Sequence, residues 1–255
     1  MSTLHAHADF DANAARPSFL ARNHFLLRRL HSLTGVAFGG FLLFHLTINA
    51  TLIEGTREIG TPTVFQQLVT TIHLVPFLGA VSWTLLLFPI IFHTIYGIYI
   101  TYTGQPNVGS YGYTRNWLYI FQRVSAVFIM VFLTFHVLTM KGWIGGGDGT
   151  LRALLRFEPL YATASVSMHL QAAWWIGWVI YPIGVLASTF HLANGFYTAA
   201  ITWGLTISST AQKRWGILCV FVFLGAFSAG MTALVAGLTV SLAENEQVVR
   251  AVVTR

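Results

Sequence analysis

Two short motifs each occur twice along this chain: FLLFHL at residues 41–46 returns as FLTFHV at 132–137, and FHTIYGIY at 92–99 returns as FHLANGFY at 190–197. Every copy places one histidine inside a long run of apolar residues. Because the two motifs alternate along the chain, they predict a unit of two helices that is used twice. The four histidines are His45, His93, His136 and His191.

The composition indicates a polytopic membrane protein. Of the 255 residues, 9% are charged and 55% are hydrophobic, whereas a soluble domain carries about 25% charged residues. The single cysteine, Cys219, excludes an internal disulfide, a zinc site built from several thiolates and covalent haem attachment. Runs long enough for the roughly 20 residues of a membrane-spanning helix lie at about 29–52, 76–101, 118–141, 172–203 and 215–241.

Charge and hydropathy divide the chain into a cytoplasmic N-terminal segment at 1–28, a five-helix membrane domain at 29–241 and a C-terminal tail at 242–255. The first 20 residues are polar and lack the apolar core of a signal peptide. Lys and Arg residues precede the first, third and fifth predicted helices, whereas acids offset the bases in the loops at 53–75 and 142–171. The positive-inside rule therefore puts the N-terminus in the cytoplasm and these two loops outside.

The four histidines are expected at two depths. With a rise of about 1.5 Å per residue, His45 and His136 lie about 8–10 Å from the outer ends of their helices. His93 lies about 12 Å from the inner end of its helix, and His191 is displaced inward in the same way. We therefore predict an outer pair, His45 and His136, and an inner pair, His93 and His191.

Two such pairs favour haem iron over other metals. Zinc takes three or four ligands at one level, with carboxylate or cysteine support, and the predicted helices contain no internal Asp or Glu. Two axial imidazoles with aromatic surroundings suit haem, and without a covalent attachment motif the haems are of the b type. The sequence thus predicts an all-α membrane protein, a five-transmembrane-helix bundle with two stacked haems b. For any single histidine, a neutral imidazole hydrogen-bonded within the bundle is the alternative.

Further residues on these helix faces are candidates for contact with a planar ligand. Gly97 and Gly195 each follow a histidine by four residues, where the missing side chain leaves room for such a ligand; helix packing is the alternative for both. His31 precedes His45 by 14 residues on one face, but the equivalent position of the second repeat is Gln122. We therefore do not expect His31 to be an axial ligand.

The segment RRLHSLTGVAFGGFLLFH, from Arg28 to His45, resembles the first transmembrane helix of the di-haem, single-polypeptide cytochrome b anchor of succinate:quinone oxidoreductases. This family includes succinate dehydrogenases and quinol:fumarate reductases, and the resemblance covers essentially the whole chain. It implies a subunit of a bacterial cytoplasmic (inner) membrane that anchors a flavoprotein and an iron–sulfur subunit. Electrons would pass from the iron–sulfur subunit through the inner and then the outer haem to membrane quinone.

The resemblance also suggests roles for polar residues near the inner side. Candidates for contacts with haem propionates or quinone are Arg28, Arg29, His31, Ser32 and Arg123. An arginine fork suits a propionate carboxylate. For Arg28 and Arg29 a role in topology is the alternative, whereas an arginine as deep as Arg123 requires an anionic partner.

Proton exchange with a quinone near the outer haem requires an ionisable group. Glu54, Glu58 and His73 of the first outer loop are candidates, with plain solvation as the alternative. In the best-known di-haem fumarate reductases, an acid two residues before the ligand of the fourth helix helps to carry protons across the membrane. Here that position is Thr189, so a quinone reductase without such a proton path is the better match.

The sequence leaves three other functions open. A di-haem anchor of a hydrogenase or formate dehydrogenase would place two ligands on one shared helix. A transporter or channel with histidine relays would have intramembrane acids and helices broken at the midplane; Pro89 and Pro182 could kink the second and fourth helices. A purely structural anchor that has lost haem would tolerate the loss of some of the four histidines, all of which are present.

Overall fold

The computed structural model describes residues 19–56, 63–144 and 154–242, and the regular structure within these ranges is helical. In this part of the chain five helices are long and apolar enough to cross a membrane, which confirms the five predicted segments. They are His24–Glu54, Leu78–Thr103, Thr114–Met140, Ile176–Thr202 and Ser209–Thr239. The first and last begin several residues earlier than predicted, because polar residues continue each helix beyond its apolar part. Most of the predicted segments 1–28 and 242–255 lies outside the described residues.

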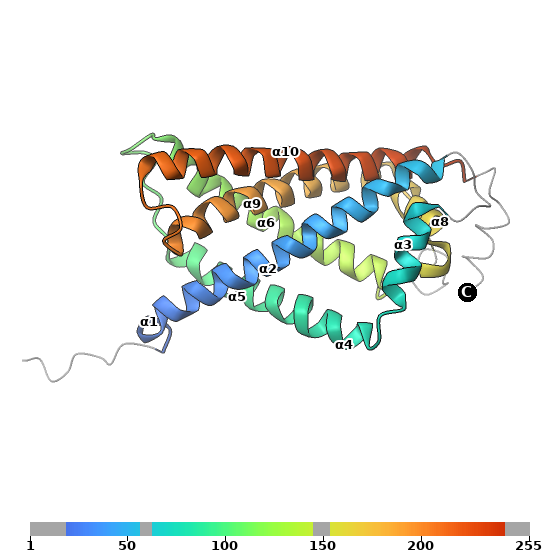
Figure 1. Ribbon diagram of the computed structural model, residues 1–255, viewed down its shortest axis with the longest axis horizontal. Coiled ribbons are helices and arrows are strands. Elements are labelled where there is room, and N and C mark those ends of the chain that lie inside the picture. Colours follow the sequence, from blue (N-terminus) through green and yellow to red (C-terminus); the bar gives the residue numbers. More distant parts are fainter. Residues whose placement is uncertain (1–18, 57–62, 145–153, 243–255) are drawn as a thin grey trace, which may run out of the picture.

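Short helices and single turns join and extend the five spans (Figure 1). In chain order the elements are α1 (Phe19–Arg22), α2 (His24–Ala50), η1 (Thr51–Thr56), α3 (Val64–His73), α4 (Leu78–Ser82), η2 (Trp83–Leu87), α5 (Phe88–Thr103), α6 (Thr114–Met140), η3 (Pro159–Tyr161), α8 (Ala162–Gln171), η4 (Ile176–Ile180), α9 (Tyr181–Thr202) and α10 (Ser209–Thr239).

The second and fourth spans share an irregularity just before a proline. In the second span the π-helical turn η2 leads directly into α5, whose second residue is Pro89. In the fourth span the π-helical turn η4 leads directly into α9, whose second residue is Pro182. Proline has no N–H to donate to the preceding turn, and one wide turn accommodates the missing hydrogen bond. Both spans therefore continue through their prolines and are not broken at the midplane.

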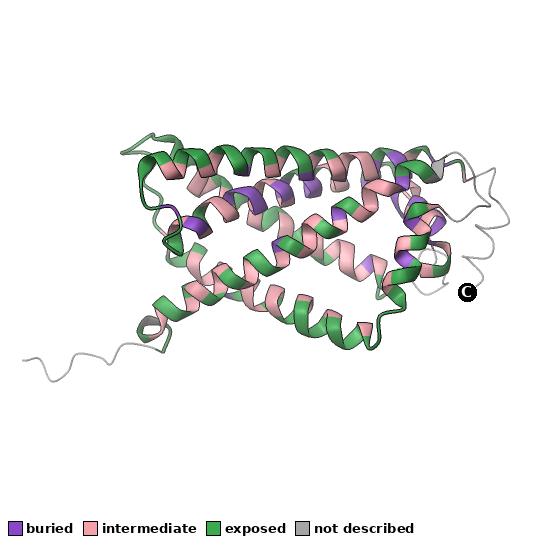
Figure 2. Cartoon of the chain, viewed as in Figure 1, coloured by how far each residue is buried: buried purple, intermediate pink, exposed green. Residues whose placement is uncertain are grey.

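Two pairs of neighbouring helices form the bundle. α2 packs against α5, and α6 packs against α9, so the two motifs of each repeat lie on adjacent helices. α2 and α10 both contact α9 and so join the two pairs, and α10 runs along one side of the bundle (Figure 1). Half of the most apolar window of the α9 span is buried, against none for the α5 span. α5 is thus a peripheral helix whose exposed apolar side chains suit lipid (Figure 2).

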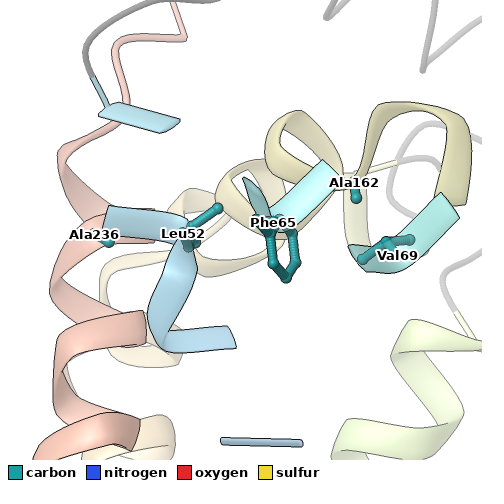
Figure 3. Packing of buried hydrophobic residues seen from close by; sticks show 5 residues of the cluster. All are labelled: Leu52, Phe65, Val69, Ala162 and Ala236. Atoms are coloured by element: carbon teal, nitrogen blue, oxygen red, sulfur yellow. The ribbon is translucent and has the colours of Figure 1, made fainter. Parts of the chain in front are cut away.

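A small helical cap covers the end of the bundle where α2 ends. α3 lies across this end (Figure 1) and begins after Thr63, whose hydroxyl accepts the backbone N–H of Gln66 at 3.1 Å. The Gln66 side chain donates to the carbonyl of Pro159 and accepts the N–H of Ala162, both at 2.8 Å, which ties α3 to α8. Beneath these bonds lies a buried apolar cluster (Figure 3) of Leu52, Phe65, Val69, Ala162 and Ala236.

The cap corrects the expectation of plain outer loops at 53–75 and 142–171. These segments contain α3 and α8, each ten residues long and too short to span the membrane. Their polar residues lower the mean hydropathy, so a search for spans does not detect them. The glycine-rich stretch 145–149 lies outside the described residues.

Gly35 and Gly39 allow α2 to approach two other helices of the same chain. A Cβ at Gly35 would lie 2.6 Å from Cε1 of His93 on α5, and a Cβ at Gly39 would overlap Leu192 and Phe196 on α9. Small residues four apart on one face permit close helix contact. Here that contact is internal to the bundle and brings α2 next to both second helices of the repeats.

Gly177 in η4 is a position where even a methyl group does not fit. Its Cβ would lie 2.6 Å from Cδ2 of Leu238 and 2.7 Å from the backbone carbonyl oxygen of Leu170. We expect Gly177→Ala to destabilise the protein by about 1–3 kcal/mol, measured as a lower Tm of the purified protein in detergent. Gly225→Ala is the control, because nothing lies within 4 Å of that position. An equal loss of Tm in both variants would contradict this packing.

Candidate functional site

A long cavity of about 1760 Å³ runs between α2, α5, α6 and α9. A small-molecule pocket usually measures about 300–1,000 Å³, so this cavity has room for more than one cofactor-sized molecule. It extends from Arg28, near the start of α2, to Lys141, just after α6, and its wall is mostly apolar. The four predicted histidines all line it: His45, His93, His136 and His191.

The outer pair is formed across this cavity. The ring centroids of His45 on α2 and His136 on α6 are 6.0 Å apart, and the ring planes are at 81°. A phenylalanine one turn earlier packs beside each imidazole, Phe41 at 5.6 Å from His45 and Phe132 at 5.7 Å from His136. The FLLFHL and FLTFHV motifs therefore build the same local arrangement on the two helices.

The inner pair comes from the second helix of each repeat. The ring centroids of His93 on α5 and His191 on α9 are 6.3 Å apart, with the planes at 79°. Nδ1 of His93 donates to the backbone carbonyl of His31 at 3.0 Å, and Nδ1 of His191 donates to that of Gln122 at 3.1 Å. His31 and Gln122 are equivalent positions, each 14 residues before the outer histidine of its repeat. A backbone carbonyl at the equivalent position thus orients the inner histidine in both repeats. At His191 the Ser125 hydroxyl also lies 3.2 Å from Nδ1.

The two pairs lie at different levels of the bundle. His93 lies against Gly35, whereas His45 is ten residues further along α2, a separation of about 15 Å along the helix axis. The structure therefore brings the four histidines together in the two predicted pairs.

The ring-centroid distances of both pairs are compatible with one metal ion held between two imidazoles. Metal–nitrogen bonds of about 2.0 Å on opposite sides of an ion put the ring centroids about 6 Å apart, as they are here. A histidine that donates through Nδ1 also keeps the lone pair of Nε2 free for a metal. Within the described ranges, no three His, Cys, Asp or Glu residues form a cluster that could hold a metal ion. Two protein ligands in a large apolar cavity fit haem iron, which takes its other ligands from the porphyrin.

His31, Gly97 and Gly195 lie beside the inner pair. The His31 ring stacks on the His93 ring at 3.9 Å and 11°, and its buried Nδ1 has no hydrogen-bond partner among the described residues. A Cβ at Gly97 would lie 3.2 Å from Cε1 of His31, and a Cβ at Gly195 would lie 3.7 Å from Nε2 of Gln122. Both glycines line the cavity, and the side chains nearest to them come from the two equivalent positions on α2 and α6.

Arg123 has the surroundings expected of an anion-binding residue. Its guanidinium carbon lies 3.4 Å from the Tyr119 ring centroid, and Nη1 donates to the Tyr119 carbonyl at 3.1 Å. Its Nε is buried and has no partner in the part of the chain that the structure describes. Arg28 is exposed and also lines the cavity, so both arginines lie where an anionic group in the cavity could reach them.

Arg29 and Ser32 meet at Trp203. The Arg29 guanidinium lies 4.7 Å from the Trp203 ring, and the indole Nε1–H donates to Oγ of Ser32 at 3.1 Å. Ser32 lines the cavity, whereas Arg29 is absent from the described wall. The structure therefore gives Arg29 a packing role against aromatic side chains.

The predicted proton-exchanging groups are dispersed. His73 lines the cavity, and its Nδ1 donates to the carbonyl one turn earlier at 2.8 Å. Glu54 is exposed on η1, and Glu58 lies outside the described residues. Thr189 is fully buried and donates its hydroxyl proton to a carbonyl of its own helix at 2.8 Å. The position that carries an acid in di-haem fumarate reductases is thus committed to an internal hydrogen bond.

Sequence reasoning missed two residues behind the outer pair, Tyr181 and His169. The Tyr181 hydroxyl lies 2.9 Å from Nδ1 of His136 and 2.8 Å from Nε2 of His169. His169 is fully buried in α8, and this burial lowers its pKa from 6.5 to about 4, although its hydrogen bond to the Leu155 carbonyl acts in the opposite direction. The sequence predicts a loop at 142–171, whereas the structure forms α8 there. Only the prediction of a buried helix in this segment would indicate His169.

A known protein resembles most of this chain and matches it over nearly the whole of its own length. The succinate dehydrogenase cytochrome b558 subunit of Bacillus subtilis (strain 168) is 31% identical to it over 213 residues, which are 83% of this chain and 96% of the relative. No family model matches the chain. The chain belongs to the succinate dehydrogenase cytochrome b family. It is therefore a membrane subunit of a succinate dehydrogenase complex, and the resemblance noted from Arg28 to His45 is confirmed.

Family membership argues against two of the three other functions considered from the sequence. A succinate dehydrogenase cytochrome b is neither a transporter nor the anchor of a hydrogenase or formate dehydrogenase. The structure agrees, because both proline-containing spans are continuous. His31 also has no counterpart on α6, where the equivalent residue is Gln122, so α2 and α6 do not form a pair of helices with two ligands each.

The lowered pKa of His169 makes stability depend on pH within a defined window. Above pH 6.5 this histidine is neutral in both the folded and the unfolded chain, whereas between pH 6.5 and about 4 only the unfolded chain takes up the proton. Unfolding therefore becomes more favourable as the pH falls through this window. We expect the Tm of the purified protein to fall less over this range in His169→Asn than in the native protein. An equal pH dependence of Tm would contradict a buried, neutral His169.

Proposed function

We propose that this subunit carries two haems b and passes electrons between the iron–sulfur subunit of succinate dehydrogenase and a membrane quinone. His45 and His136 hold the outer haem, and His93 and His191 hold the inner haem. The main support is the spacing of the two ring pairs, 6.0 and 6.3 Å between centroids, in one apolar cavity.

The chain's own residues orient the ligands and control their surroundings. Bound haem iron supplies one-electron transfer. The carbonyls of His31 and Gln122 hold the inner imidazoles with Nδ1 turned away from the cavity. The apolar wall excludes water, and a low dielectric is one of the factors that set a reduction potential. Arg123, with its buried and unpartnered Nε, is the residue best suited to a haem propionate.

The distribution of charge supports an N-terminus on the cytoplasmic side. Arg28 lies near the start of α2, Arg115 near the start of α6 and Lys213 near the start of α10. Arg115 donates to Gln212 at 2.7 Å, so the starts of α6 and α10 lie together. With this end in the cytoplasm, the inner pair faces the flavoprotein and iron–sulfur subunits, and electrons leave for quinone from the outer pair.

Single substitutions of the four histidines test the pairing. His45→Ala and His136→Ala should each abolish the low-spin spectrum of one haem, and His93→Ala and His191→Ala that of the other, because each haem needs two axial imidazoles. The measurement is the dithionite-reduced minus oxidised spectrum of each purified complex. Each variant should lose about half of the native haem b absorbance, and both members of a pair should lose the same spectral component.

Reduction by succinate tests the place of the haems in electron transfer. In the native complex with its flavoprotein and iron–sulfur subunits, succinate should reduce both haems. Four variants that all lose the same spectral component would contradict the pairing. A fully assembled complex whose haems stay oxidised in succinate, yet are reduced by dithionite, would contradict the electron-transfer role.

Gly35 tests the position of the inner pair without changing a ligand. A Cβ at Gly35 would lie 2.6 Å from Cε1 of His93, so Gly35→Ala must displace this imidazole. We expect the inner haem to bind about 10–100-fold more weakly while the outer haem is retained, as measured by haem titration of the purified protein. Gly40→Ala on the same helix is the control, because nothing lies within 4 Å of that position. A normal inner haem in Gly35→Ala would contradict the proposed position of His93.

A further inference from the structure

His136 of the outer pair is connected to a chain of hydrogen bonds that leads away from the cavity. Nδ1 of His136 lies 2.9 Å from Oη of Tyr181, and this oxygen lies 2.8 Å from Nε2 of His169. Nδ1 of His169 lies 2.9 Å from the carbonyl oxygen of Leu155. Three short contacts therefore link α6, α9 and α8 to the segment before η3.

The proton positions in this chain follow from its last acceptor. A carbonyl oxygen only accepts, so Nδ1 of His169 carries a proton and donates it to Leu155. Because the burial of His169 favours its neutral form, its Nε2 is unprotonated and accepts the hydroxyl proton of Tyr181. The hydroxyl has no second proton, so Oη accepts from Nδ1 of His136. His136 is thus held as the tautomer whose Nε2 lone pair is free for a metal.

The inner pair has different acceptors. His93 and His191 donate to the backbone carbonyls of His31 and Gln122, which are parts of helices. Oγ of Ser125 also lies 3.2 Å from Nδ1 of His191, but its hydroxyl donates back to the Gln122 carbonyl at 3.1 Å, so no second imidazole follows it. The Tyr181 hydroxyl donates a hydrogen bond to His169. A hydroxyl that donates in this way is polarised, and its oxygen becomes a stronger acceptor. The outer and inner pairs therefore differ in the groups that accept the Nδ1 proton of their histidines, although the sequence motifs around the histidines repeat.

We propose that Tyr181 and His169 are positioning residues that set the reduction potential of the outer haem separately from that of the inner haem. The inference rests on the proposed function, because it takes His136 as an axial ligand. An acceptor behind a ligating histidine makes the imidazole more basic, and a more basic ligand favours ferric over ferrous iron. Tyr181 and His169, acting through His136, therefore lower the potential of the outer haem.

Tyr181→Phe removes the acceptor and keeps the aromatic ring. In a potentiometric titration of the assembled complex, the ferric-to-ferrous ratio of the outer haem at a fixed ambient potential should fall about tenfold, which raises its midpoint by about 59 mV. The inner haem should keep its midpoint. The outer haem is identified as the spectral component that is lost in His136→Ala.

Tyr96→Phe is the matched control. Tyr96 is also buried, and its hydroxyl lies 3.0 Å from Nδ1 of a histidine, His24, that is not a proposed ligand. This variant should leave the outer midpoint unchanged.

His169→Asn provides a second variant that keeps Tyr181 and removes only its acceptor. The outer midpoint should rise again, by less than in Tyr181→Phe, because the hydroxyl remains but is no longer polarised. If the complex with Tyr181→Phe does not assemble, the midpoint of the outer haem in His169→Asn tests the inference. Two bound haems with unchanged midpoints in the assembled variants, or equal shifts of both haems, would overturn this inference alone. A native protein without two haems, or a His136→Ala variant that keeps both, would instead overturn the proposed function.

Discussion

An imidazole that lines an apolar cavity needs a hydrogen-bond partner for its N–H, and the centre of this bundle depends on that requirement. Each inner histidine donates Nδ1–H to a carbonyl of the neighbouring helix: His93 on α5 to α2, and His191 on α9 to α6. These bonds select the nitrogen that faces the cavity. They also connect the two helices of each repeat, so the packing of α2 with α5 and of α6 with α9 fixes the orientation of these two histidines as well.

Much of the fold could be predicted because hydrocarbon imposes a simple rule on the sequence. A membrane-spanning helix must be long and apolar, so hydropathy alone locates the five spans to within a few residues at most ends. No comparable sequence rule predicts the helical cap. α3 and α8 are short, and their burial depends on contacts between distant segments, such as Gln66 with Pro159. A local pattern does not contain that information.

The histidine pairs could be predicted, whereas the groups that orient the histidines could not. Helix rise and alternating direction place His45 with His136 and His93 with His191, and the ring distances agree with both pairs. The equivalence of His31 and Gln122 is visible in the sequence, but there it indicates only that His31 lacks a second histidine to pair with as a metal ligand. Their shared role belongs to the backbone carbonyl, which any residue provides. His169 reaches the outer pair only through Tyr181 and through the folding of α8, and sequence spacing reveals neither contact.

The central claim is that four histidines on four helices hold two cofactors at two levels. The most direct test is pyridine haemochrome quantitation, against protein, of the purified native complex. We predict two haems b for each copy of this chain. A single haem, or none, in a complex that retains its other subunits would contradict the claim.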